Sequence, residues 1–249
     1  MSASPSTRSV IAPAQPPAQS PALLSGLSEV PLLERTEDGV AWPLLLWAPG
    51  PGWRMLSSAV LGGGWGERHW VLNAQVTPGY RRPDPAAHLA ALAAEAGASG
   101  PGVGLMTAAC VADRRSATDE GVEALVTAGV GVHGWAAAPA VAARPGPPRA
   151  GTINIVAALP VPLGPAALVN AVTTATEAKV QALRDAGYDA SGTPTDAVCV
   201  AAPLAPGGRD GSDEEPFAGP RSRWGSRLAR AVHTATLAAC LADHHRRVG

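Results

Sequence analysis

The sequence predicts a single α/β domain in which a mixed sheet is packed by helices, preceded by a disordered N-terminal tail. Short apolar runs have the length of β-strands, whereas longer segments repeat their apolar residues with the period of an α-helix. That mixture is typical of α/β proteins. At 249 residues the chain is long enough to bury a full hydrophobic core. We therefore expect the tail over residues 1–27 and one domain over residues 28–249.

The tail is expected from its composition. Residues 1–27 are rich in Pro, Ser, Ala and Gln, so they bury too little apolar surface to offset the entropy lost on ordering. Two later segments, 143–149 and 206–216, are rich in Pro and Gly or in acidic residues. We expect both to be loops that interrupt the domain and do not divide it.

Five apolar runs are short enough to be strands, and each lies between loops or longer helical segments. In chain order they are residues 40–47, 70–76, 102–106, 153–159 and 197–202. We expect these runs to supply the sheet.

The clearest helix is expected to begin at Pro165, a favourable first-turn residue, and to end near Gly187, which suits a left-handed C-terminal position. Helical spacing gives this segment two faces. The apolar face holds Leu168, Val172, Ala175 and Leu183, and the polar face holds Asn170, Thr174, Glu177 and Gln181.

A last helix is expected over residues 223–244, and it should pack across the sheet. Its core-facing residues are expected to be Leu228, Val232, Ala235 and Leu241.

Composition excludes several classes of function. Charged residues make up 16% of the chain and the net charge is −1, so no basic surface is expected for nucleic acid. The three cysteines form no CxxC pair, which argues against disulfides and structural zinc. No leader-like segment and no apolar run of about 18 residues is present. We expect a cytoplasmic protein with neither nucleic acid nor a membrane as partner, and a homo-oligomer remains open.

Polar groups gather around the helix over 165–187. Glu177 lies on its polar face, and Thr193, Thr195 and Asp196 follow it in a loop before an apolar strand. A mid-helix Glu is most often a solvated surface residue, and Thr and Asp in a turn commonly bond local backbone. The alternative is that carboxylates and hydroxyls converge at the strand end. Both interpretations of the loop can hold together.

Three further polar residues lie within apolar strands. Thr152 and Asn154 alternate with Ile153 and Ile155, so the two polar side chains should share one face of a strand. That strand is either a half-exposed edge or one whose polar face lines a cleft. Asn73 presents the same choice, and if buried it needs hydrogen-bond partners, which could be a bound amide or backbone groups.

Familiar signatures are missing from the rest of the chain. The glycine run 62–64 lacks both the GxGxxG and the GxxxxGK[ST] pattern of phosphate-binding loops. No paired-histidine zinc motif and no GxSxG nucleophile turn occurs, so we expect no metal ligands. Tryptophans gather in the first third of the chain, where core packing is the default and a broad planar ligand is the alternative. They are Trp42, Trp47, Trp53, Trp65 and Trp70.

Six motifs in the same order resemble the adenosylcobinamide amidohydrolase (CbiZ-type) family, and the resemblance covers most of the chain after the tail. The motifs are SSAVLGGG at 57–64, WVLNAQV at 70–76, GLMTAA at 104–109, GTINI at 151–155, TEAK at 176–179 and GTPTDA at 192–197. Residues 132–135 depart from the family pattern, which implies a changed fit to the substrate.

The resemblance implies hydrolysis of the amide that joins the aminopropanol arm to the corrin ring of adenosylcobinamide. The products would be adenosylcobyric acid and 1-amino-2-propanol, in corrinoid salvage or remodelling. A corrinoid is then the small-molecule partner, its cobalt belongs to the substrate, and no cofactor is expected. A corrinoid-binding protein without catalysis is the alternative from another class.

Amide hydrolysis needs an activated water, a stabilised oxyanion and a proton for the amine. We expect Glu177 to be the general base and Asp196 to orient it or a hydroxyl. Thr193 is a candidate for polarising the carbonyl. Substrate binding is expected to involve Asn73, Thr152, Asn154 and Thr195.

A different mechanism gives the central role to Thr152. Cleavage after Gly151 would release Thr152 as an N-terminal nucleophile that uses its own amine as base. The sequence leaves this alternative open.

Overall fold

The computed structural model describes residues 26–139, 151–205 and 213–248. The expected tail, except for Gly26 and Leu27, and the expected loop over 143–149 therefore lie outside the described residues, as does most of the loop over 206–216. Leu27 was expected to belong to the tail, yet its side chain is only 1% exposed and packs in the core. It lies in the short 3₁₀ turn η1 (Leu27–Glu29), which contacts the second sheet described below.

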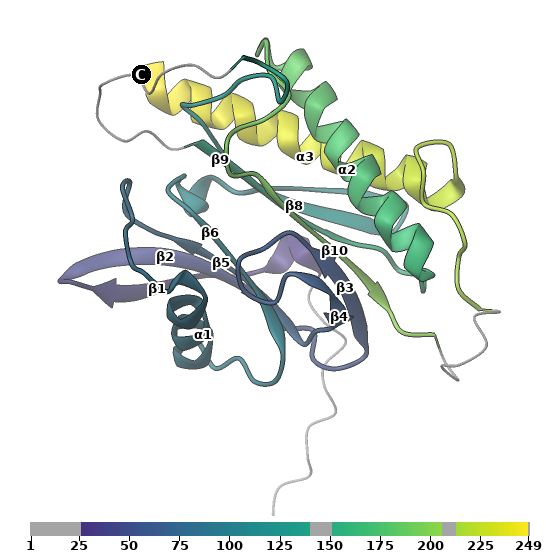
Figure 1. Cartoon of the computed structure of the whole chain (residues 1–249), viewed down its shortest axis with the longest axis horizontal. Coiled ribbons are helices and arrows are strands. Elements are labelled where there is room, and N and C mark those ends of the chain that lie inside the picture. Colours follow the sequence, from purple (N-terminus) through teal and green to yellow (C-terminus); the bar gives the residue numbers. More distant parts are fainter. Residues whose placement is uncertain (1–25, 140–150, 206–212, 249) are drawn as a thin grey trace, which may run out of the picture.

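The α/β class is confirmed, but the strands form two mixed sheets where one was expected. The sheets face each other, helix α1 covers the outer side of one, and helices α2 and α3 cover the outer side of the other (Figure 1). The layers are therefore helix, sheet, sheet and helix.

The first sheet has four strands in the order β1 (Leu32–Glu37), β2 (Val40–Trp47), β5 (Trp70–Gln75) and β6 (Gly102–Thr107). Strands β5 and β6 are parallel and the other neighbours are antiparallel. Helix α1 (Pro85–Glu95) connects the parallel pair. It begins with Pro85 in its first turn and Asp84 as its N-cap, whose side chain accepts a hydrogen bond from Ala87 N.

The second sheet has six strands in the order β4 (Gly64–Glu67), β3 (Trp53–Ser57), β10 (Ala197–Pro203), β9 (Gly151–Ala158), β8 (Val122–Val130) and β7 (Arg115–Asp119). Only β9 and β10 are parallel. Helix α2 (Pro165–Asp185) connects these two strands, and α3 (Arg223–Val248) packs against α2 and β8. A second 3₁₀ turn, η2 (Val111–Asp113), follows β6.

The core has three parts, which correspond to the spaces between the layers. The largest lies between the second sheet and helices α2 and α3, a smaller one lies between the sheets, and a third lies under α1. Ile153 and Ile155 face the helices, whereas Val156 and Ala158 of the same strand face the first sheet. The alternation along β9 therefore separates two apolar layers.

Helix α2 has the expected ends, and Gly187 adopts the left-handed φ of +86° just after it. Its faces differ from the prediction at one position. Thr174 was placed on the polar face, but it is buried, and its hydroxyl donates to Ala218 O at 2.8 Å. A buried hydroxyl is tolerated because it finds this acceptor.

The expected core-facing set of α3 is wrong at one residue. Leu228, Val232 and Ala235 are buried, but Leu241 is 41% exposed. Thirteen residues after Leu228 the helix has turned to about 220° around its axis, which points Leu241 away from the core. Ala239 falls on the buried face in its place.

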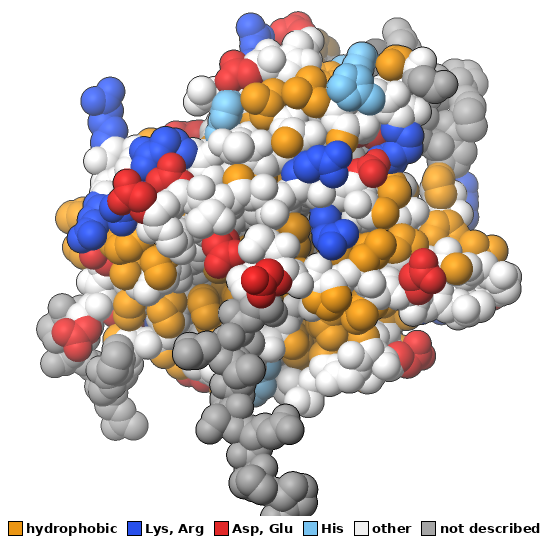
Figure 2. Space-filling model, turned by 180° about the vertical axis from the view of Figure 1, so that it is seen from behind, with side chains coloured by type: hydrophobic (Ala, Val, Ile, Leu, Met, Phe, Trp, Pro, Cys, Tyr) orange, Lys and Arg blue, Asp and Glu red, His pale blue; other side chains and the backbone are white. Residues whose placement is uncertain are grey.

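The surface mixes charge and apolar groups. Side chains of Lys, Arg, Asp and Glu lie interspersed with apolar ones on the face seen in Figure 2, in keeping with a net charge of −1. Within residues 26–139, 151–205 and 213–248, no helix is long and apolar enough to cross a membrane.

Candidate active site

Polar residues from distant parts of the chain meet where β9 and β10 begin. These two strands are parallel, and their register pairs Ala197 with Asn154, which brings Asp196 beside Ile153. Helix α2 passes over the same edge, so its Lys179 reaches the same point. We call Thr152, Lys179, Thr193, Thr195 and Asp196 the Thr–Lys–Asp cluster.

Asp196 is the centre of this cluster. Its Oδ1 accepts hydrogen bonds from Ile153 N at 2.9 Å and from Thr193 Oγ1 at 2.5 Å. Its Oδ2 accepts from Thr193 N at 3.1 Å and from Lys179 Nζ at 2.5 Å. Four donors therefore hold the carboxylate in one orientation and occupy both of its oxygens.

Lys179 is buried, with 7% of the residue exposed, and its ammonium forms an ion pair with Asp196. A buried ammonium is costly unless it is paired. The loop permits this approach because it has Gly192 at the contact, where a Cβ atom would lie 2.7 Å from Lys179 Nζ and 2.5 Å from Asp196 Oδ2. Sequence reasoning did not select Lys179 for the site.

Two threonines form a second contact in the cluster. Thr152 Oγ1 and Thr195 Oγ1 are 2.5 Å apart, and Thr195 Oγ1 donates to Gly151 O at 2.9 Å. Because Thr195 donates to the carbonyl, Thr152 is the donor in the hydroxyl pair. The hydrogen bonds thus run from the Thr152 hydroxyl to the carbonyl of the peptide bond that precedes it.

An open groove of about 730 Å³ adjoins the cluster. Lys179, Thr193 and Asp196 line it directly, and residues 132–136 form another part of its wall. Trp135 in this wall is 44% exposed, and the Arg184 guanidinium lies 5.6 Å from its ring centre. The segment 132–135, for which a changed fit to the substrate was expected, thus lines the groove.

The structure does not bring Glu177 into this cluster. Glu177 lies on the exposed side of α2 and is not among the residues that line the groove, although Thr176, Lys179 and Val180 are. Its assignment as the general base stays a prediction.

Asn73 and Asn154 meet between the two sheets. Asn154 Nδ2 donates to Asn73 Oδ1 at 2.9 Å and to Met106 O at 3.1 Å, and Asn73 Nδ2 donates to Thr127 Oγ1 at 2.9 Å. Strand β9 lies inside its sheet, so the edge-strand interpretation is wrong. Asn73 and Asn154 are 5% and 1% exposed, and their contact with substrate stays a prediction.

Two of the cysteines, Cys199 and Cys240, are buried. Burial raises the pKa of the thiols of Cys199 and Cys240 to about 12 in each case. These two thiols are therefore protonated near neutral pH and are poor nucleophiles. Across the described part of the chain, no three His, Cys, Asp or Glu side chains are grouped to hold a metal ion.

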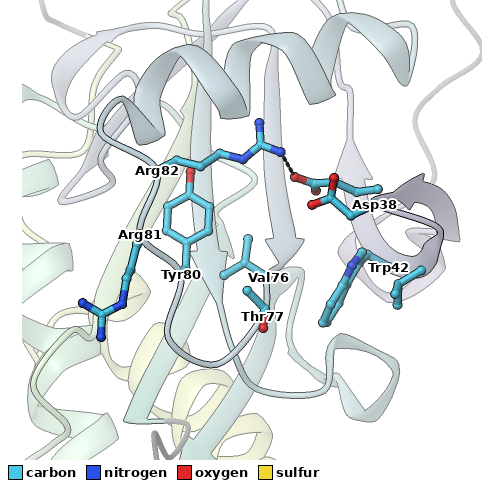
Figure 3. Close-up of a pocket in the computed structure, with 9 residues that line it drawn as sticks. Asp38, Trp42, Val76, Thr77, Tyr80, Arg81 and Arg82 are labelled. Carbon is cyan, nitrogen blue, oxygen red and sulfur yellow. Dashed lines mark hydrogen bonds and ion pairs between the residues drawn. The ribbon is translucent and has the colours of Figure 1, made fainter.

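A second hollow, of about 470 Å³, lies at the outer end of the first sheet. Trp42 and Tyr80 stand on either side of it, with Val76 and Thr77 between them (Figure 3). The other tryptophans of the first third of the chain differ in exposure. Trp47 and Trp70 are buried, whereas Trp65 is 57% exposed.

His88 provides a pH-dependent contribution to stability beside this hollow. Its Nδ1 is 2.9 Å from the Tyr80 hydroxyl and its Nε2 is 3.2 Å from Glu37 Oε1. Burial lowers the pKa of His88 below its ordinary value of 6.5, although Glu37 opposes the shift. The His88 imidazole therefore binds its second proton more tightly in the unfolded chain than in the folded protein. The contribution of neutral His88 to the free energy of unfolding is complete above pH 6.5. It is lost as the pH falls through the pKa of His88 in the folded protein.

Urea unfolding of wild type and His88→Gln at about pH 7.5 and about pH 5 checks this sign. The wild-type protein should lose more free energy of unfolding on acidification than the variant. An equal loss in both proteins would assign the acid sensitivity to other groups.

A groove beside a buried carboxylate, an ammonium and several hydroxyls is the kind of site found in enzymes, where fixed charges and polar groups adjoin an opening to solvent. The family model described as adenosylcobinamide amidohydrolase matches residues 29–247. The adenosylcobinamide amidohydrolase of Methanosarcina mazei is 33% identical over 178 residues, which cover 70% of this chain and 84% of that protein. The chain belongs to the adenosylcobinamide amidohydrolase family, and it is a hydrolase that acts on an amide carbon–nitrogen bond.

Proposed function

We propose that this protein hydrolyses the amide between the corrin ring and the aminopropanol arm of adenosylcobinamide, giving adenosylcobyric acid and 1-amino-2-propanol. Such a reaction would serve corrinoid salvage or remodelling. Family membership supports this substrate, and the observation that carries the assignment to this site is the paired Lys179–Asp196 contact on the groove.

The cluster provides one of the functions that amide hydrolysis requires, stabilisation of the oxyanion, and it holds the group that supplies it in place. The Lys179 ammonium is a fixed positive charge at the groove and can stabilise the oxyanion of the tetrahedral intermediate. Asp196 keeps that ammonium and the Thr193 hydroxyl in place, so neither has to reorganise as charge develops. Asn73 and Asn154 would support the site indirectly, because the hydrogen bond between their side chains joins β5 to β9.

Purified protein incubated with adenosylcobinamide tests the reaction. Mass spectrometry should find adenosylcobyric acid together with an equal amount of 1-amino-2-propanol. Binding of the corrinoid with its amide left intact would contradict the proposal and favour a carrier.

Glu177→Gln tests whether a base on the outer side of α2 is required. Because Glu177 is exposed and does not line the groove, we expect kcat/KM within about threefold of wild type, whereas loss of a general base costs about 10²–10⁴-fold. Steady-state turnover of adenosylcobinamide provides the measurement. A drop of about 100-fold in a folded variant would establish that Glu177 is needed, as the sequence predicts.

A further inference from the structure

We propose that the chain cleaves its own Gly151–Thr152 peptide bond and that the released Thr152 is the nucleophile of the amide hydrolysis. The first half of this inference concerns the protein alone. The second half rests on the proposed function.

The groups needed to cut this bond are already positioned around it. The Thr152 hydroxyl, which would attack, lies 2.5 Å from the Thr195 hydroxyl, and that same hydroxyl donates to the Gly151 carbonyl oxygen at 2.9 Å. One side chain thus contacts both the attacking oxygen and the carbonyl oxygen that receives a proton. This is the arrangement that a positioned acid–base group requires.

Position 151 has too little room for a Cβ atom, which glycine lacks. A Cβ atom at Gly151 would lie 3.0 Å from Val132 Cβ and 3.1 Å from Val132 O, closer than most side-chain contacts allow. Val132 and Pro194, which both line the groove, are the neighbours of that position. The bond therefore lies beside the groove, where water can reach it.

The strand would stay in place after the cut. Asp196 Oδ1 holds Ile153 N, and β9 pairs with β8 on one side and β10 on the other. Thr152 itself is only 8% exposed. These contacts lie on the C-terminal side of the bond, so they fix the new N-terminus once it forms.

The chemical step is an amide-to-ester rearrangement followed by hydrolysis. Thr152 Oγ bonds to the Gly151 carbonyl carbon while its proton passes to Thr195, which gives its own proton to the carbonyl oxygen. The tetrahedral intermediate then breaks its carbon–nitrogen bond, and the proton moves to the departing Thr152 nitrogen. Water next hydrolyses the ester, leaving a carboxylate on Gly151 and a free amine and hydroxyl on Thr152.

The new terminus supplies what the cluster otherwise lacks. The free amine of Thr152 can accept the proton of its own hydroxyl, whose oxygen then attacks the carbonyl carbon of the substrate amide. The carbon–nitrogen bond breaks, the Thr152 ammonium gives that proton to the departing aminopropanol nitrogen, and an ester with the corrinoid is left. Water hydrolyses that ester in turn. Asp196, with four donors already in contact, is then needed only to position its neighbours.

Intact-mass analysis of the purified wild-type chain tests the cleavage directly. We expect two fragments, residues 1–151 and 152–249, and N-terminal sequencing of the second should begin Thr-Ile-Asn-Ile. A single uncut chain, or a cut at another bond, would overturn the inference.

Three variants test the assigned roles. Thr152→Ala should stay uncut, Thr152→Ser should still be cut, and Thr195→Val should be cut about 100-fold more slowly. Far-UV circular dichroism checks that each variant is folded. Cutting of a folded Thr152→Ala chain at the wild-type rate would overturn the mechanism.

The assay of adenosylcobinamide separates the two proposals. A cut protein that leaves adenosylcobinamide intact would refute the proposed function and leave self-cleavage standing. An uncut protein that forms adenosylcobyric acid would refute self-cleavage and leave the proposed function standing.

Discussion

Replacing Lys179 by methionine is expected to lower the free energy of unfolding by about 3 kcal/mol. The methionine keeps most of the buried aliphatic volume but leaves the Asp196 carboxylate, which is 11% exposed, without its cation. Breaking a buried ion pair from one side costs about 3–5 kcal/mol, and the remaining donors of Thr193 and Ile153 place the loss at the lower end. Urea unfolding followed by circular dichroism measures the change.

Arg184→Gln is the matched control on the same helix. Arg184 also pairs with an aspartate, Asp189, but the two side chains are 54% and 84% exposed. Such a pair contributes about 0–1 kcal/mol. If Lys179→Met costs no more than this control, the buried pair does not hold the two strands and α2 together.

Asp196→Asn is expected to lower kcat/KM for adenosylcobinamide by about 100-fold. The amide of asparagine would present a donor toward Lys179 Nζ and Thr193 N, so the ammonium and the loop would leave their positions. A misplacement of about 1 Å in a catalytic site can cost this much. Steady-state kinetics, corrected for the folded fraction at the assay temperature, provide the measurement.

The double variant with Lys179→Met sharpens this prediction. If Asp196 acts by holding Lys179, the two changes should cost little more together than either alone. Losses that multiply would instead assign the two residues independent roles, and wild-type turnover in Asp196→Asn would remove Asp196 from the site.

Local signals were sufficient for the ends of several elements. Pro165 and Gly187 mark the ends of α2, and the apolar run over 40–47 coincides with β2. Half of the strands were not predicted, and β8 is the most important of them. Its Ala, Gly and Thr residues give it no clear strand pattern, and its place between β7 and β9 depends on pairing with distant segments. The division into two sheets was not predicted either, because it also depends on pairing between distant segments.

The candidate site was partly predictable. Thr152 lies far in sequence from the consecutive residues Thr195 and Asp196, and the parallel register of β9 and β10 brings them together. Lys179 was not predicted, although it lies two residues after Glu177 in the TEAK motif. Lys179 follows Ala175 by four residues and precedes Leu183 by four, so it lies on the apolar stripe of α2. A charged residue on a buried stripe is a signal for a paired ion.

Hydrolysis of adenosylcobinamide in ¹⁸O-labelled water tests the central claim most directly. Cleavage of the aminopropanol amide at this site requires that the adenosylcobyric acid carry one oxygen from water in its new carboxylate, with aminopropanol released in equal amount. Both should disappear in folded Thr152→Ala. Recovery of unaltered adenosylcobinamide from the wild-type protein, or a product without the water oxygen, would contradict the account.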